Sequence, residues 1–512
     1  MEKYRDLSRA LESFQMQPMH VQGSIGALLL LTLVTVIVVS WLERTSKEKV
    51  DFPIVGSTEV KDFRPILEEG TKRYPNSPFI IPTTMHDIIV LPISAVEEIK
   101  RLPESQISLR KHHYEVFQGQ YTKFGTDTDE LDAAIRIDLT RRVDKILLAF
   151  QDEVEYAFSV AVGTAETPTA VTVYPRMLKV IALLSSRVFV GLPLSRNDEW
   201  LKTVCSYSMA VANGAHNLAP YPAWIRPIIA PFMLTELKRA HASAAEMLGP
   251  ILAKYKDADM SSQNVENLAG SEGGDFIGYI LSHYKRTVTP EQLGLDQLIA
   301  TFAALHTTTI ALTQVIFELA QRPCYVEPLR EEIFTALGSR ESRLPQFNKD
   351  TIHSLRKMDS FIKETQRVNP PSLITMHRIV TDPEGLRLKS GHRIPLGHHI
   401  GVPNHLGNIS HPDQDQFIGF RWSDMRDQPG QETAHQWVTT GLGHLNFGHG
   451  SHSCPGRFFA ANEIKVALSY VLLNYDICYP EGETRPENIH TNTIVLPSES
   501  AQVLFKYKRR DE

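Results

Sequence analysis

The chain has 512 residues, a net charge of −6 and 42% hydrophobic residues, so it can bury a large core. The acidic balance argues against nucleic acid as a partner, since nucleic-acid binders carry a basic excess. The four cysteines are far apart and include no Cys-x-x-Cys pair. This excludes a disulfide scaffold and a four-cysteine zinc site, and it is typical of a reducing compartment.

An uncharged apolar segment, residues 21–42, reads VQGSIGALLLLTLVTVIVVSWL. A helix of about 20 such residues spans a bilayer, whereas the apolar region of a cleaved signal peptide is shorter, roughly 7–15 residues. We therefore predict a tail at 1–20, a single transmembrane anchor at 21–42, a linker at 43–51 and one folded domain at 52–512. Basic residues flank the anchor equally on both sides, so the positive-inside rule does not orient it.

The folded domain begins with short strands at 79–82 and 87–92 and a helix at 95–101, as proline-ended apolar runs indicate. Helical apolar spacing follows at 130–163, and further helices are expected at 175–190, 198–214 and 234–256. Residues 257–274 are polar and rich in Gly and Ser, which favours a loop.

The longest predicted helix covers 289–321. Thr289 is its expected cap, Pro290 suits its first turn, and Gln292 completes a capping box. Residues 299–317 carry no formal charge, but the polar side chains among them would be costly in lipid, which favours a buried core helix.

The C-terminal third has predicted helices at 328–337, 358–368 and 457–475, and strands at 374–380 and 392–395. With no internal repeat and no obvious linker after residue 52, the expected fold is one large, mostly α domain with a minor β part.

The stretch from 447 to 460, FGHGSHSCPGRFFA, places Cys454 in a Gly-rich and Ser-rich loop that leads directly into a helix. A helix N-terminus presents free N–H groups and a positive dipole end, which we expect to lower the pKa of the thiol. Gly450 and Gly456 would let the backbone pass close to a flat ligand. A thiolate in this setting suits haem iron.

This loop resembles the haem-binding signature FxxGxxxCxG of the cytochrome P-450 family, through Phe447, Gly450, Cys454 and Gly456. Glu364 and Arg367 likewise resemble its ExxR motif, for which the resemblance implies Arg421 as the third, structural partner. The resemblance implies a P-450 type domain for nearly everything after the anchor.

The segment 303–308, AALHTT, resembles the family's oxygen-activating motif on the long helix, A/G-G-x-D/E-T-T/S. Two positions depart from it: Ala304 replaces a glycine and His306 replaces an acid. The resemblance implies catalytic roles for Thr307 and Thr308, with His306 as a proton relay that titrates near neutrality.

The resemblance also implies haem b, with Cys454 as the axial iron ligand and Arg378 and His452 as partners of the haem propionates. The implied substrate pocket consists of Phe302, Ala303, Leu373, Thr375, Met376, Val495 and Leu496.

The implied activity is that of a monooxygenase using O2 and NADPH, with NADPH–cytochrome P-450 reductase and cytochrome b5 as electron-transfer partners. The implied location is the endoplasmic reticulum membrane, with the catalytic domain in the cytosol. The closest resemblance is to fungal microsomal members, which implies a hydrophobic substrate such as a terpenoid, meroterpenoid or indole-terpenoid of secondary metabolism.

Two other functions stay open from the residues alone. A haem-thiolate isomerase or dehydratase would need neither O2 nor a reductase. A haem sensor would bind haem reversibly at Cys454-Pro455. A separate hypothesis concerns the apolar, aromatic segment 221–227, together with Ile228, Ile229 and Phe232, which we expect to dip into the membrane surface.

Overall fold

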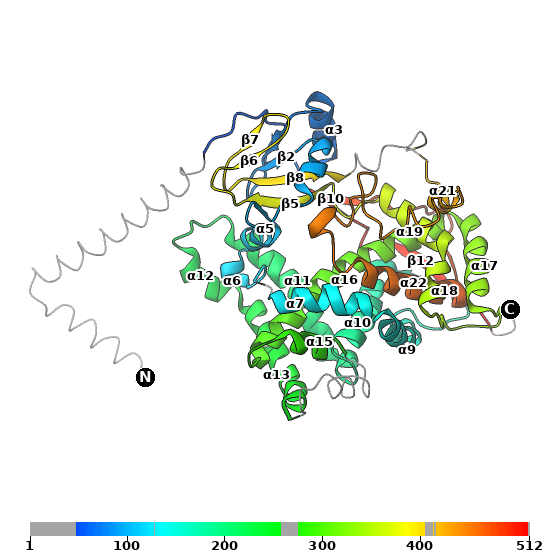
Figure 1. Cartoon of the computed structure of the whole chain (residues 1–512). Helices are drawn as coiled ribbons and strands as arrows, with labels where there is room; N and C mark the ends of the chain where they lie inside the picture. Colours follow the sequence, from blue (N-terminus) through cyan, green and yellow to red (C-terminus); the bar gives the residue numbers. More distant parts are fainter. Residues whose placement is uncertain (1–47, 127, 258–274, 405–412, 414–415, 510–512) are drawn as a thin grey trace, which may run out of the picture.

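The computed structural model describes residues 48–126, 128–257, 275–404, 413 and 416–509. The predicted tail, anchor and first part of the linker, and nearly all of the predicted loop at 257–274, lie outside these residues. The described chain is mostly helical with a minor sheet part, as the sequence predicts. In Figure 1 the strands β2, β5, β6, β7 and β8 gather at the top, above the helices.

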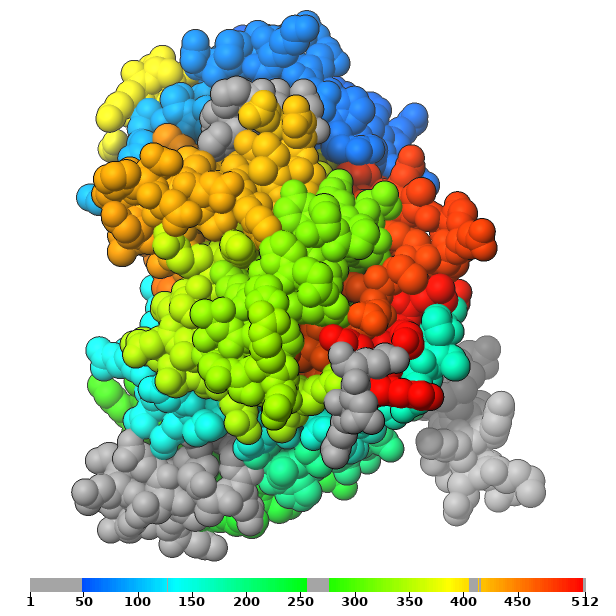
Figure 2. Space-filling model, turned by 90° about the vertical axis from the view of Figure 1, so that its right-hand side faces the viewer, coloured from blue at the N-terminus to red at the C-terminus, as the bar shows by residue number. Residues whose placement is uncertain are grey.

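The helices lie mainly in the larger, lower part of the molecule. Their bounds are α3 Arg64–Arg73, α4 Val96–Ile99, α5 Leu109–Val116, α6 Gly119–Thr122, α7 Asp129–Ala133, α8 Leu139–Arg141, α9 Val143–Ala161, α10 Val173–Phe189, α11 Asp198–Leu218, α12 Arg226–Met233, α13 Thr235–Asp257, α15 Asp275–His283, α16 Pro290–Gln321, α17 Val326–Leu337, α18 Lys349–Ser354, α19 Arg356–Val368, α21 Arg421–Arg426 and α22 Arg457–Asn474. Figure 2 shows α17 and α18, in green and yellow-green, at the centre of one face, with the C-terminal residues in red beside them.

The strands form one larger sheet and three small ones. A five-stranded sheet has the order β1-β2-β8-β5-β3, in which only β2 and β8 are parallel neighbours; β4-β12-β9, β10-β11 and β6-β7 are antiparallel. The bounds are β1 Phe79–Ile81, β2 Ile88–Val90, β3 Ile107–Ser108, β4 Thr169–Thr172, β5 Ile374–Val380, β6 Leu386–Arg387, β7 Arg393–Ile394, β8 His399–Pro403, β9 Tyr475–Cys478, β10 Ile489–Thr491, β11 Ile494–Leu496 and β12 Gln502–Tyr507.

Both faces of the five-stranded sheet are covered. Side chains alternate along a strand, so Ile80 and Ile89 enter one apolar cluster while Phe79 and Val90 enter another on the opposite face. Every residue of β1 and β2 is therefore buried. This explains why both read as continuous apolar runs rather than alternating ones.

Helix α16 is the central element of the helical core and packs against α10, α11, α13, α19 and α22. Its 32 residues correspond to roughly 48 Å at 1.5 Å per residue. Among the described residues it is the one helix long and apolar enough to cross a membrane, but 72% of its most apolar window is buried inside the protein. The sequence reading of a core helix is therefore confirmed.

The predicted start of α16 is correct, but the predicted capping box is only half formed. Thr289 Oγ1 accepts a hydrogen bond from the Gln292 N–H at 3.2 Å. The Gln292 side chain does not return to the cap; its Nε2 donates to Asp296 Oδ1 at 3.0 Å. A buried carboxyl one turn along the helix is the competing acceptor.

The region predicted to be helical at 130–163 contains two irregularities. Residues Ala134–Asp138 form a π turn, and the backbone leaves helical geometry at Arg142. Apolar spacing reports which face is buried and does not report the hydrogen-bond register, so neither feature was visible in the sequence.

Candidate active site

One apolar cavity lies between α16, the first turn of α22 and the loop that carries Cys454. Its apolar walls include Ile135, Leu139, Phe189, Ala300, Phe459 and Ala460. Its polar lining groups are few: Thr307 and Thr308 on α16, Gln366 on α19, Asn446 and Cys454. A mostly apolar wall with a few polar groups is typical of a small-molecule or cofactor site.

The Cys454 loop is held by its own backbone. The N–H of Cys454 donates to the carbonyl of Phe447 at 2.7 Å, and the backbone N–H groups of Gly456 and Arg457 act on the sulfur and favour its thiolate form. Burial nevertheless outweighs these donors and raises the pKa of the Cys454 thiol above its ordinary value. The lowering expected from the helix N-terminus is thus present, but the net shift in the protein alone is upward, and a bound cation would deprotonate such a thiol outright.

Gly450 and Gly456 serve different purposes. Gly450 has φ +82°, and a Cβ there would lie 2.0 Å from the carbonyl oxygen of Lys100, so the glycine is needed for backbone packing against the sheet region. Gly456 lines the cavity, and a Cβ there would meet no protein atom within 4 Å. The predicted close approach to a flat ligand therefore suits Gly456, while Gly450 is explained by Lys100.

The long helix presents Ala303 and Thr307 to the cavity on one face, as their spacing of four predicts. Thr307 Oγ1 donates to the carbonyl of Ala303 at 2.8 Å. Thr308 also lines the cavity, and its buried hydroxyl has no partner in the described protein. A buried hydroxyl without a partner costs free energy, so a polar bound group at this wall would be stabilising.

His306 is not among the cavity-lining residues. Its Nδ1 lies 3.2 Å from the hydroxyl of Tyr174 on α10, and burial lowers the pKa of its imidazole. The structure therefore places the expected relay group against α10 and not beside Thr307. The helical spacing already separates the two, since adjacent residues on a helix differ by about 100° in direction.

Glu364, Arg367 and Arg421 meet in a buried cluster. Arg367 donates two hydrogen bonds of 2.9 Å to the Glu364 carboxylate, and Arg421 Nε lies 3.3 Å from Glu364 Oε1. The Trp422 indole N–H and the Ile418 backbone N–H also donate to Glu364, at 3.1 and 3.0 Å. Four sources of hydrogen bonds thus surround a carboxylate that is fully buried.

Arg378 and His452, the expected propionate partners, lie close enough to interact electrostatically. Arg378 is 4% exposed, and within the described chain no carboxylate forms an ion pair with it; burial lowers its pKa to about 10. His113 lies near it, and desolvation, followed by Arg378, lowers the pKa of His113 to about 4. Glu104 acts on Arg378 electrostatically and the His377 carbonyl accepts from it, but a buried guanidinium without an ion pair suits an anionic group from outside the protein.

The other predicted pocket residues do not line the cavity, except Ala303. Phe302 packs on Phe117 and Phe124. The remainder lie in or beside the strands β5 and β11: Leu373, Thr375, Met376, Val495 and Leu496. Of these, Leu373, Met376 and Val495 are buried in the apolar clusters of the sheet.

Sequence reasoning missed several lining residues. Pro371 follows the Glu364–Arg367 motif in the chain, and Asn446 precedes Phe447, so proximity to motif residues was the available signal. Trp437 and Phe189 also line the cavity and carried no such signal.

A thiol on an apolar wall, a glycine that leaves room beside it, hydroxyls on the facing helix and a buried arginine with a histidine near it together fit a haem-thiolate enzyme. The family model described as Cytochrome P450 matches residues 145–505, so the chain belongs to the cytochrome P-450 family and is a monooxygenase. The family implies haem as its cofactor.

Curated relatives agree over nearly their full lengths. The chain is 37% identical to cytochrome P-450 monooxygenase ataF of Aspergillus terreus, covering 91% of this chain and 94% of that protein. It is 38% identical to gliF of Aspergillus fumigatus, with the same coverage, and 37% identical to BOA7 of Botryotinia fuckeliana, covering 94% and 96%. The solved structure of retinoic acid-bound cyanobacterial CYP120A1 has a TM-score of 0.66 at 16% identity, covering 90% of this chain and all of that one, which shows the fold alone.

Proposed function

We propose that this monooxygenase oxidises a hydrophobic small molecule, of the terpenoid, meroterpenoid or indole-terpenoid class, in fungal secondary metabolism. The observation that carries the proposal is that Cys454 and the hydroxyl-bearing Thr307 and Thr308 line one apolar cavity. Electrons would come from NADPH through a reductase, with cytochrome b5 as a further donor.

The residues that would hold the haem are on different elements. Cys454 would ligate the iron, Gly456 leaves space beside the sulfur, and Arg378 with His452 would face the propionates. When bound, haem supplies the reductive activation of O2 that the substrate oxidation requires.

The side chains of the cavity would position the substrate and deliver a proton. Thr307 has a hydroxyl on the cavity wall whose hydrogen bond goes to its own helix, and rotation about one side-chain bond would aim it into the cavity. Thr308 offers a second hydroxyl with no protein partner to displace. The apolar side chains around them exclude water and accommodate a hydrophobic substrate.

The membrane is the proposed setting, with the catalytic domain on the cytosolic side of the endoplasmic reticulum. Beside the apolar segment 21–42, support comes from α12, where Ile228 is 62% and Phe232 79% exposed. Large exposed apolar side chains grouped on one short helix mark an interaction site and fit the interfacial region of a lipid bilayer.

The experiment starts with the purified, haem-loaded full chain. Its reduced, carbon monoxide-treated Soret band should lie at the thiolate wavelength, and Cys454→Ala should lose both that band and oxidative turnover. A screen of terpenoid and alkaloid scaffolds by spectral binding, followed by turnover with a reductase, then identifies the substrate class. Turnover without NADPH and O2 would contradict the proposed monooxygenase reaction. Binding confined to non-terpenoid scaffolds would contradict the proposed substrate class.

A further inference from the structure

A group of histidines lies outside the cavity that contains Cys454. His86 is in the turn between β1 and β2, His112 is on α5, and His399 is the first residue of β8. One ring nitrogen from each lies within 4.8 Å of the others. The three residues come from distant parts of the sequence, so only the fold brings them together.

The ring contacts are close. Nδ1 of His112 is 3.0 Å from Nδ1 of His399, and the ring centroids of His86 and His399 are 4.0 Å apart. In a tetrahedral zinc site with Zn–N distances of about 2.0–2.1 Å, two ligand nitrogens are roughly 3.4 Å apart. The separations are at most 4.8 Å, so a shift of up to about 1.4 Å would bring all three nitrogens to this ligand distance.

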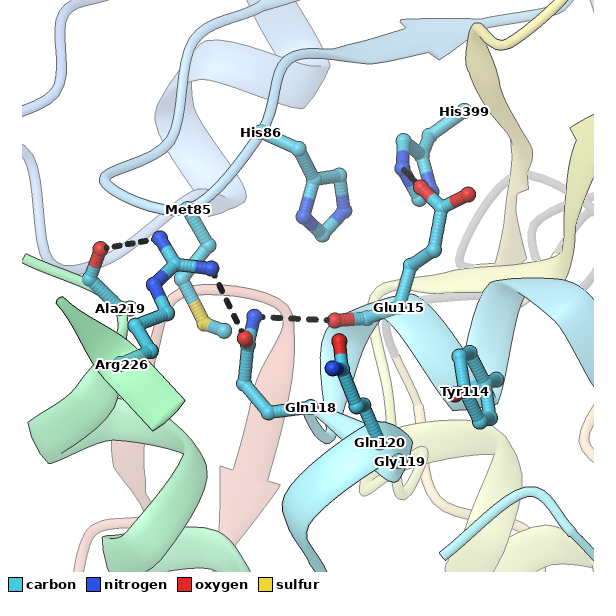
Figure 3. Close-up of a pocket in the computed structure, with 10 residues that line it drawn as sticks. All are labelled: Met85, His86, Tyr114, Glu115, Gln118, Gly119, Gln120, Ala219, Arg226 and His399. Carbon is cyan, nitrogen blue, oxygen red and sulfur yellow. Dashed lines mark hydrogen bonds and ion pairs between the residues drawn. The ribbon is translucent and has the colours of Figure 1, made fainter. Parts of the chain in front are cut away.

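A carboxylate orients one of these rings. Glu115 Oε2 lies 3.3 Å from Nε2 of His399. Figure 3 shows the Glu115 carboxylate beside His399, with the ring of His86 directed toward the same side of a second cavity. His112 faces the other ring nitrogen of His399, so Glu115 supports that ring from outside the group and the three imidazoles are the ligands. Three imidazoles and a water form a set that zinc accepts.

Two of the three imidazoles are enclosed by protein, since His112 is 6% exposed and His399 4%. An imidazole binds a metal ion through the lone pair of one ring nitrogen and can donate a hydrogen bond from the other.

The surroundings accept a dication. Arg226 is the cation on the far wall of the same cavity, and its guanidinium is held by Gln118 Oε1 at 2.9 Å and by the carbonyls of Ala219 and Tyr221 at 3.0 and 2.7 Å. The backbone of the His86 turn is also fixed, because the Thr83 hydroxyl accepts from the His86 N–H at 3.1 Å and donates to its carbonyl at 2.5 Å. The ligands are thus presented by an ordered frame.

We propose that His86, His112 and His399 form a three-histidine zinc site that ties the β1–β2 turn, α5 and β8 together at the edge of this cavity, with Glu115 orienting His399. Water would take the fourth position of the zinc. A soft thiolate is absent from the set, and imidazole also suits Cu2+ and Ni2+, so zinc is expected to share the site with these ions in vitro.

The test uses the haem-loaded full chain, purified without a polyhistidine tag and dialysed against Zn2+. We expect one zinc per chain by elemental analysis, three nitrogen ligands by zinc-edge X-ray absorption, and a higher thermal unfolding temperature with Zn2+. His86→Ala and His399→Gln should each weaken zinc binding at least about tenfold, while His216→Ala, at an exposed histidine on α11, should not.

His86 is only partly buried, so its variant should keep the fold even if changes at His112 or His399 do not, and haem content checks this. The proposal would be overturned if the wild type and His86→Ala bound zinc equally. It would also be overturned if the wild type contained no more zinc than the double variant with His86→Ala and His399→Gln. In that case the group is a hydrogen-bonded histidine cluster.

Discussion

The hydroxyl of Tyr174 lies 3.2 Å from Nδ1 of His306, which joins α10 to α16 one residue before the cavity-lining Thr307. Where the family motif has an acid, this chain therefore has an imidazole engaged with a neighbouring helix. The consequence is that the threonines, and not His306, are the polar groups of α16 that can reach a molecule in the cavity.

The first prediction separates these two residues. Thr307→Val removes the cavity hydroxyl and keeps the side-chain shape, and we expect product formation to fall at least about tenfold, since a positioned proton donor contributes roughly 10²–10⁴-fold. Thr307→Ser should retain most activity. His306→Gln should have a much smaller effect; turnover per haem measures all three, and an equal loss in His306→Gln would restore the relay hypothesis.

The second prediction concerns the Glu364 cluster. Glu364→Gln keeps the shape but leaves Arg367 and Arg421 buried without their carboxylate. Breaking a buried pair in this way costs about 3–5 kcal/mol, so the free energy of unfolding should fall by that amount. Glu327→Gln is the matched control, because Glu327 is 71% exposed in its pair with Arg330 and surface pairs contribute about 0–1 kcal/mol. Similar losses in both variants would contradict the prediction.

The third prediction compares two glycines of the Cys454 loop. Gly450→Ala forces a side chain onto a backbone with φ +82° and against the Lys100 carbonyl, so we expect a loss of folded protein by circular dichroism. Gly456 has φ −83°, which alanine also adopts, and a Cβ there would meet no protein atom within 4 Å. The Gly456→Ala chain should therefore fold. Its new methyl group would enter the cavity, and haem content measured by absorbance should fall. Normal haem content in Gly456→Ala would remove this residue from the haem contact.

The fourth prediction is a pH dependence at Glu463 on α22. This carboxyl is fully buried, accepts one hydrogen bond of 2.7 Å from Ser185, and has a pKa that burial raises to about 8. An acid whose pKa is higher in the folded chain stabilises the fold at low pH, and this contribution is lost as the pH rises from its ordinary value of 4.5 toward 8.

Glu463→Gln should remove the loss of stability that accompanies ionisation of this carboxyl. The free energy of unfolding of the variant, relative to the wild type, should rise by about 1.4 kcal/mol per pH unit inside this window. Denaturant titrations between pH 5 and 8 check it, and parallel curves for the two proteins would contradict the raised pKa.

The fifth prediction concerns α12. A protein lacking residues 1–47 should still bind lipid vesicles, and Ile228→Ser with Phe232→Ser should weaken that binding because two exposed apolar side chains are lost. Leu442→Ser, at a 44% exposed leucine elsewhere on the surface, is the control. Vesicle sedimentation unchanged by the α12 pair would exclude this helix as a membrane contact.

The fold class, the long core helix and the Cys454 loop could all be predicted from the amino-acid sequence. These depend on local or strictly spaced signals: the cap at Thr289, the spacing of Ala303 and Thr307, and the four fixed positions of the loop motif, Cys454 among them. Short-range geometry follows from the periodicity of the backbone, so predictions of this kind agree with the folded structure.

Which residues lie together in space could be known only from the folded chain. Folding turned His306 toward Tyr174, buried Leu373, Met376 and Val495 in the sheet clusters, and assembled His86, His112 and His399 from segments up to 313 positions apart. It also set the sign of the Cys454 pKa shift, because desolvation depends on every atom packed around the sulfur. Packing and burial are sums over distant segments, and no local pattern contains them.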